Sequence, residues 1–259
     1  MRILCIGDVC GSNGCDALRT ILPKLKRDKN IDLTIVNGEN SHDKNGIVLK
    51  SCEHIFTSGA DIITTGNHVF RRKEFYDVLN TNDYVIRPAN YTSKAHGKGV
   101  CVYDMGRLSV GVINLLGFLY VGAPINPFLV VDELVQELQN DGVRIIIVDL
   151  HAEATSEKRA MGYYLDGRIS ALFGTHTHVQ TSDAQILPKG TGYITDVGMT
   201  GAKNSVLGIA PETAIAKMKE MLPAPFEFTG GESILGGVVF DIDEKTGLCT
   251  KTETICEYC

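Results

Sequence analysis

Short apolar runs alternate with amphipathic segments over the first half of the chain. An apolar run that ends at glycine is typical of a strand covered on both faces by helices. Segments whose apolar residues recur every three or four positions are typical of helices that pack on such a sheet. The pattern predicts strands at 2–7, 32–38 and 61–67, and helices at 15–29 and 48–59.

The second half continues the alternation and adds two hairpins, at 99–117 and 232–255. Met-Gly-Arg forms the predicted turn of the first hairpin, and Lys-Thr-Gly forms that of the second, where apolar and polar residues alternate. The other predicted elements are helices at 127–142, 158–164 and 211–222, and strands at 143–150, 168–174, 182–188 and 190–196.

This order of elements predicts one α/β domain, residues 1–259, built as a sandwich of sheets and helices. We find no internal repeat and no linker rich in Pro, Gly or Ser that would divide the chain. Loops within 116–128 and 198–230 are long enough to form a small cap.

Composition and charge narrow the function classes. A net charge of −6 without a Lys/Arg block argues against a bulk nucleic-acid-binding surface. The N-terminal run lacks the pattern of a signal peptide, and the apolar stretch 108–123 is too short to span a bilayer. Eight scattered cysteines then predict free thiols in a reducing cytoplasm. The terminal CxxC, 256–259, has no second pair and is weak evidence for zinc.

Polar side chains follow five of the predicted strands, at the carboxyl end where ligands bind in wound α/β sheets. All of them are carboxylates, carboxamides or imidazoles, which can bind metal ions. Taken alone, each histidine is equally compatible with a hydrogen-bonded structural role, so it is the joint pattern that indicates a site at one sheet edge. The set comprises Asp8, Glu39, Asn40, Asn67, His68, His151, His176 and His178.

The spacing of His176 and His178 fits a metal site, because residues i and i+2 of an extended chain point to the same side. Mixed nitrogen and oxygen donors suit Mn, Fe, Zn, Co or Ni better than Ca or Mg. Seven or more ligands are too many for one tetrahedral ion and suit a pair of ions, as used in attack on phosphorus. Only Asp8 and Glu39 are anionic, so two divalent ions would keep a positive charge that attracts phosphate.

At these residues the sequence resembles the YmdB-like branch of the calcineurin-like metallophosphoesterases, which are 2′,3′-cyclic-nucleotide 2′-phosphodiesterases. The resemblance covers essentially the whole chain and implies an α/β/β/α layered sandwich. Its segments, in order, are IGDVCG, VNGEN, TTGNH, DLHAEATSEK, FGTHTHVQT and TDVGMTG.

The resemblance also implies a role for each position. The cofactors would be two metal ions, most commonly iron, with manganese as an alternative. Glu39 would bridge the ions and His68 would protonate the leaving oxygen. The first ion would be held by Asp8, Glu39, Asn40 and His178, and the second by Glu39, Asn67, His151 and His176.

Three positions depart from the wider superfamily. Its Gly-Asp pair is Gly38-Glu39 here. Its Asp-x-His opening is Asp8-Val9-Cys10 here, so Asn40 would replace the missing ligand and Cys10 is interpreted as a buried spectator. The acidic residue that often follows Asn-His is Val69, so the sequence does not show what orients His68.

The expected reaction is hydrolysis of a 2′,3′-cyclic nucleotide to a 3′-nucleotide, by a hydroxide that the two ions generate from a shared water. The expected partner is thus a small phosphodiester, with no membrane, and a homo-oligomer stays open. Two alternatives also stay open. The same centre could serve a phosphomonoesterase or protein phosphatase, or the chain could be a regulatory scaffold that affects RNA turnover.

Overall fold

The computed structural model of the protein describes residues 1–221 and 228–259. The helices are α1 (Gly11–Lys29), α2 (Leu49–Thr57), the 3₁₀ turn η1 (Lys73–Phe75), α3 (Tyr76–Thr81), α4 (Pro127–Asn140), α5 (Thr155–Leu165) and α6 (Pro211–Glu220). The strands are β1 (Arg2–Ile6), β2 (Asp8–Val9), β3 (Leu33–Asn37), β4 (Ile62–Thr64), β5 (Val100–Asp104), β6 (Ser109–Leu116), β7 (Ile145–His151), β8 (Ala171–Thr175), β9 (Gln185–Ile186), β10 (Gly192–Ile194), β11 (Met199–Ala202), β12 (Ser233–Ile242) and β13 (Cys249–Tyr258).

The strands form two sheets. The first has the order β2-β11-β12-β1-β3-β4, with β13 paired to β12, and the second has the order β5-β6-β7-β8-β10-β9. β1, β3 and β4 run parallel, as do β6, β7, β8 and β10. Both predicted hairpins, β5–β6 and β12–β13, are confirmed.

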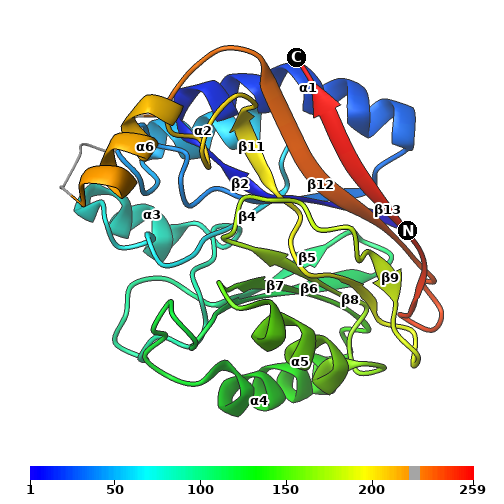
Figure 1. The fold of residues 1–259 in the computed structure, drawn as a ribbon. Helices are drawn as coiled ribbons and strands as arrows, with labels where there is room; N and C mark the ends of the chain where they lie inside the picture. Colours follow the sequence, from blue (N-terminus) through cyan, green and yellow to red (C-terminus); the bar gives the residue numbers. More distant parts are fainter. Residues whose placement is uncertain (222–227) are drawn as a thin grey trace.

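The sheets pack face to face, with α1 and α2 outside the first and α4 and α5 outside the second (Figure 1). Three groups of buried side chains match these layers. Leu18 of α1 belongs to the outer group of the first sheet, and Val131 of α4 to that of the second. Ile35 of β3 and Ile147 of β7 meet in the central group between the sheets. The predicted α/β/β/α layered sandwich is confirmed.

Several details of the sequence-based prediction were wrong. The polar strand ends do not lie on one sheet, because β3 and β4 belong to the first sheet while β7 and β8 belong to the second. Helix α1 begins at Gly11, earlier than predicted, where the Ser12 amide donates to Asp43 Oδ1 at 2.7 Å. Helix α5 begins at Thr155 and is longer than predicted.

The two candidate cap segments differ in their surroundings. The segment 116–128 leads from β6 into α4 and carries the exposed side chains of Phe118 and Tyr120. The segment 198–230 contains β11 and α6, but its residues 222–227, including the predicted end of that helix, lie outside the described residues. Among the described residues, we find no helix with the length and apolar character needed to cross a membrane.

Candidate metal centre

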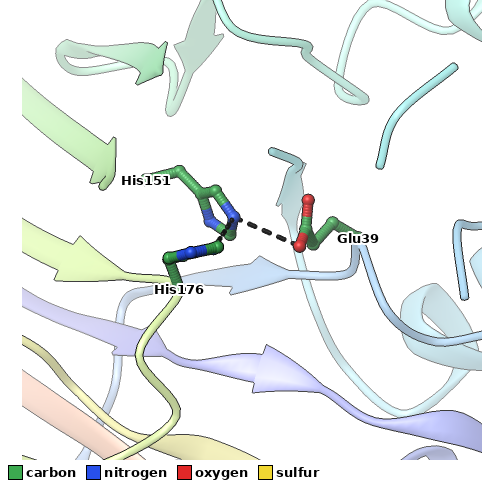
Figure 2. Close-up of side chains that lie close together, drawn as sticks. All are labelled: Glu39, His151 and His176. Atoms are coloured by element: carbon green, nitrogen blue, oxygen red, sulfur yellow. Dashed lines mark hydrogen bonds and ion pairs between the residues drawn. The ribbon is translucent and has the colours of Figure 1, made fainter. Parts of the chain in front are cut away.

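Three donor side chains from the two sheets meet at the seam between them. Glu39 follows β3, His151 ends β7 and His176 follows β8. Figure 2 shows His151 between the other two: its Nε2 lies 3.1 Å from Glu39 Oε1 and 3.1 Å from His176 Nδ1. One donor atom from each residue lies within 4.8 Å of the others, so one cation could bind all three.

Asn67 joins this group from the end of β4, with Oδ1 3.0 Å from His151 Nε2. The residue before it must be glycine for the group to come this close. A Cβ on Gly66 would lie 2.3 Å from Glu39 Oε2 and 2.4 Å from His151 Nε2. The Gly-Asn-His sequence therefore leaves the space that the donors occupy.

Asp8 provides an independent sign of a cation. Its Oδ2 accepts the His176 backbone amide at 3.0 Å, but its Oδ1 is buried and has no hydrogen-bond partner among the described residues. Oδ1 lies 3.7 Å from His151 Nδ1 and 3.8 Å from His178 Nε2. A buried carboxylate oxygen without a partner is costly, and a bound metal ion would satisfy it.

Asn40 contacts both Glu39 and His178. His178 Nδ1 donates to the Leu207 carbonyl at 3.1 Å, which leaves Nε2 as an acceptor near Asn40 Nδ2 at 3.4 Å. Asn40 Nδ2 also donates to Glu39 Oε1 at 3.0 Å. An amide nitrogen does not bind cations, so the ligand role predicted for Asn40 requires its two amide atoms to exchange places.

His176 and His178 reach the site, but not through the extended chain that the sequence predicted. The chain is not extended there, because φ is 97° at His176 and 63° at His178. Residues other than glycine rarely adopt this left-handed backbone region, which costs them about 1–3 kcal/mol each. The amide of His176 donates to Asp8 and that of Thr177 donates to Asp196 Oδ2 at 3.1 Å, and these bonds hold the strained turn.

Burial and mutual contact shift the pKa values of the cluster. Burial raises the pKa of Glu39, but the charge and hydrogen bond of His151 outweigh burial and bring the pKa well below its usual range. Burial lowers the pKa of His151, yet Glu39 and Asp8 raise it to about 9. The pKa of His176 falls to about 4 because the ring is buried beside His151. His176 is thus a neutral ligand at neutral pH, whereas His151 must lose a proton to bind metal.

The structure shows what orients His68. Its Nδ1 lies 2.9 Å from Asn40 Oδ1 and 3.3 Å from Glu39 Oε1, and its backbone amide donates to Glu39 Oε2 at 3.0 Å. Val69, at the position where an acidic residue is often found, packs in the core instead. Glu39 and Asn40 thus take the place of the missing acid.

With this geometry in view, the family model described as "YmdB-like protein" matches residues 4–255. The chain belongs to this family. It is 46% identical to a Bacillus subtilis protein named 2′,3′-cyclic-nucleotide 2′-phosphodiesterase, over 98% of this chain and 96% of the relative.

Solved structures agree with this assignment. A Mycoplasma pneumoniae structure described as a novel phosphatase has a TM-score of 0.92 and 36% identity, covering 100% of this YmdB-like chain and 93% of its own. A 5′-nucleotidase precursor from Thermus thermophilus has a TM-score of 0.63 and 13% identity, covering 99% of this chain and 54% of its own. The latter shows the fold alone.

The donors of this YmdB-like protein border a cavity of about 500 Å³. Glu39, Asn40, His68, His176 and His178 form its polar side. The segment that contains α6 contributes the apolar residues Leu207, Ile209, Met218, Met221 and Phe228 to the lining, together with the basic residue Lys217. The sequence did not indicate this apolar wall or Glu153, whose Oε2 lies 3.1 Å from His176 Nε2.

The cysteines and Arg72 near or outside the site have the following surroundings. Burial and the charges of Asp8 and Glu39 raise the pKa of Cys10 well above its usual range, and the spectator role of this thiol stays a prediction. Arg72 Nε donates to the Asn45 carbonyl at 3.1 Å. Cys256 and Cys259 are both exposed at the end of β13.

Proposed function

We propose that this YmdB-like chain is a phosphodiesterase with a dinuclear metal centre that hydrolyses 2′,3′-cyclic nucleotides to 3′-nucleotides. The observation that carries the proposal is the cluster of Glu39, His151 and His176 beside the unpartnered oxygen of Asp8. It lies at the edge of a cavity in a chain 46% identical to a protein that is named for this activity.

The ligands divide into two groups that share Glu39. The second group, formed with Asn67, His151 and His176, is already compact, because its donor atoms lie 3.0–3.1 Å from His151 Nε2. The first group would consist of Glu39, Asp8, Asn40 and His178. Iron is the proposed metal, with manganese as the alternative, since nitrogen and oxygen donors suit both. When bound, such ions lower the pKa of water and stabilise charge on phosphoryl oxygens.

His68 is the proposed proton donor to the leaving 2′-oxygen. A ribose alkoxide is a poor leaving group, so its protonation contributes on the order of 10²–10⁴ in rate. The 3.3 Å contact of Nδ1 with Glu39 Oε1 holds the ring in either orientation of the Asn40 amide and leaves Nε2 as the nitrogen for proton delivery. The side chain lines the cavity, as this role requires.

The apolar wall fits the rest of a nucleotide. A phosphate beside the polar donors would leave the nucleoside facing Leu207, Met218 and Met221, which present apolar surface to the cavity. We propose accordingly that the segment with α6 is a wall of a single domain and not a separate cap domain. The cytoplasm is the proposed compartment, because the cysteines are all free.

Metal analysis of freshly purified protein, followed by a substrate screen with that metal restored, tests the function. We expect two equivalents of metal and faster hydrolysis of 2′,3′-cyclic nucleotides than of 3′,5′-cyclic nucleotides or phosphomonoesters. Hydrolysis of monoesters alone would favour the phosphatase alternative, which the description of the Mycoplasma pneumoniae structure also suggests. Absence of bound metal after reconstitution would refute the centre itself.

His68→Ala tests the proton donor separately. The variant should keep its metal but lose turnover, with a greater loss on cyclic nucleotides than on p-nitrophenyl esters, whose leaving group needs no proton. Asp8→Ala is the comparison, and it should lose metal and activity together. Equal slowing of both substrate kinds by His68→Ala would contradict the proton-donor role.

A further inference from the structure

The three histidines His151, His176 and His178 differ in the group that contacts the ring nitrogen facing away from the other donors. His178 Nδ1 lies 3.1 Å from the Leu207 carbonyl, and His176 Nε2 lies 3.1 Å from Glu153 Oε2. A carbonyl or carboxylate oxygen can only accept a hydrogen bond. In both rings, therefore, that nitrogen carries the proton and the nitrogen facing the cluster offers a lone pair.

His151 meets a hydroxyl instead. Its Nδ1 lies 2.9 Å from Thr175 Oγ1, and a hydroxyl can either donate or accept. If Thr175 donated, the neutral ring would keep its proton on Nε2, which is the nitrogen that faces Glu39 and Asn67. If Thr175 accepts, the proton stays on Nδ1 and Nε2 offers a lone pair to the cluster.

Asp149 determines which of these occurs. Its Oδ1 lies 2.8 Å from Thr175 Oγ1, while its Oδ2 accepts the Thr64 hydroxyl at 2.5 Å and the Asn37 amide at 3.0 Å. Three donors around two oxygens are the surroundings of a carboxylate, which only accepts. The single hydrogen of the Thr175 hydroxyl therefore points to Asp149, and toward His151 the same oxygen must accept.

Asn37 is the competing donor, since its Nδ2 lies 3.5 Å from His151 Nδ1. The two hydrogens of that amide have closer acceptors in Asp149 Oδ2, at 3.0 Å, and in the Thr65 carbonyl and Thr175 Oγ1, both at 3.3 Å. Asn37 therefore supports the carboxylate and does not supply a proton to the ring.

We infer that Asp149 and Thr175 are positioning residues that keep a proton on Nδ1 of His151 and so present Nε2 to a metal ion. Both side chains are fully buried. The inference rests on the proposed metal centre but not on any substrate. Loss of a partner that holds a ligand in this way costs about 10–100-fold in metal affinity.

Mn²⁺ affinity of the full chain tests the inference with a matched set of variants. Thr175→Val keeps the shape but removes the hydroxyl and should weaken Mn²⁺ binding by about 10–100-fold, whereas Thr175→Ser should restore it. Thr64→Val removes a hydroxyl from the same carboxylate but not from the path to His151, and should change affinity by less than about threefold. Equal losses in Thr175→Val and Thr64→Val would overturn the inference.

Asp149→Asn reverses the hydrogen bonds at nearly constant shape. Thr64 and Asn37 donate on the Oδ2 side, so the new amide would place its oxygen there and its NH₂ toward Thr175. Thr175 would then donate to His151, and Mn²⁺ binding should weaken at least as much as in Thr175→Val. Binding at the level of the unaltered protein would contradict the proposed direction.

A direct observation on the unaltered protein covers the case in which a variant fails to fold. In the protein loaded with diamagnetic Zn²⁺, ¹⁵N NMR of the His151 ring should show a proton on Nδ1 and metal on Nε2. Metal on Nδ1, or a proton on Nε2, would overturn the inference. These readouts need no turnover, so they stand even if the chain proves inactive on cyclic nucleotides.

Discussion

Lys158 and Asp196 form a fully buried ion pair behind the turn that carries His176. Lys158 Nζ of α5 lies 2.7 Å from Asp196 Oδ2 and 2.7 Å from the Thr175 carbonyl, and both side chains are inaccessible to solvent. The Asp196 carboxylate also accepts the amides of Thr177 and Gly198, at 3.1 and 2.9 Å. The pair therefore connects α5 to the end of β8 and to the segment between β10 and β11.

Lys158→Met should be strongly destabilising, because it leaves the Asp196 charge buried with only amide donors. Breaking a buried pair in this way costs about 3–5 kcal/mol. For a chain of this size each kcal/mol lowers the melting temperature by about 2–4 °C. The expected fall is therefore about 6–20 °C, measured by circular dichroism on metal-free protein.

Two further variants separate the pair from general damage. Lys158→Met with Asp196→Asn removes both charges and should cost clearly less than the sum of the single changes. Lys98→Met breaks a mostly exposed pair with Asp83 and should leave the melting temperature nearly unchanged. A fall of less than about 3 °C for Lys158→Met, or additive losses in the double variant, would refute the reasoning.

Three other outcomes are expected. Gly66→Ala should abolish metal binding, because the new Cβ would overlap the donors. Gly230→Ala is the control and should keep metal, because its Cβ would meet only Asn13, at 3.9 Å. Metal analysis of both proteins decides this. Because the pKa of His151 is raised to about 9, metal binding at pH 7.5 should release about one proton. Metal affinity should rise with pH until the pH reaches about 9. Calorimetry in buffers of different ionisation enthalpy would contradict this if it detected no proton release. Native protein should expose only Cys256 and Cys259 to Ellman's reagent, and all eight thiols after denaturation, since the other six are buried; a third fast thiol would be inconsistent with this packing.

Much of the fold follows from local pattern. The buried runs at β1, β3 and β7 are short and continuous, so length and flanking glycines identify them as strands. Strand β2, with two residues, is too short to produce a pattern and forms only because β11 pairs with it. The division into two sheets likewise depends on pairing over long sequence distances, such as β1 with β12.

The site shows the same limit. Strand-end positions made Asp8, Glu39, Asn67 and His151 recognisable as candidates, and the structure brings them together. The sequence does not reveal that Leu207 orients His178 or that Asn40 contacts His68, because these contacts join residues 29 and 28 positions apart. The turn at His176 escapes a periodic pattern for another reason, since its left-handed backbone is imposed by hydrogen bonds to Asp8 and Asp196.

The position of the donors at the seam has a mechanical consequence. Glu39 and Asn67 extend from one sheet, while His151 and His176 extend from the other. An ion held by both would act as a cross-link between the halves of the sandwich, so part of its binding energy would resist their separation. Removal of the ion by a chelator would then loosen the interior at that edge first, and amide exchange at the ends of β3 and β8 would report it.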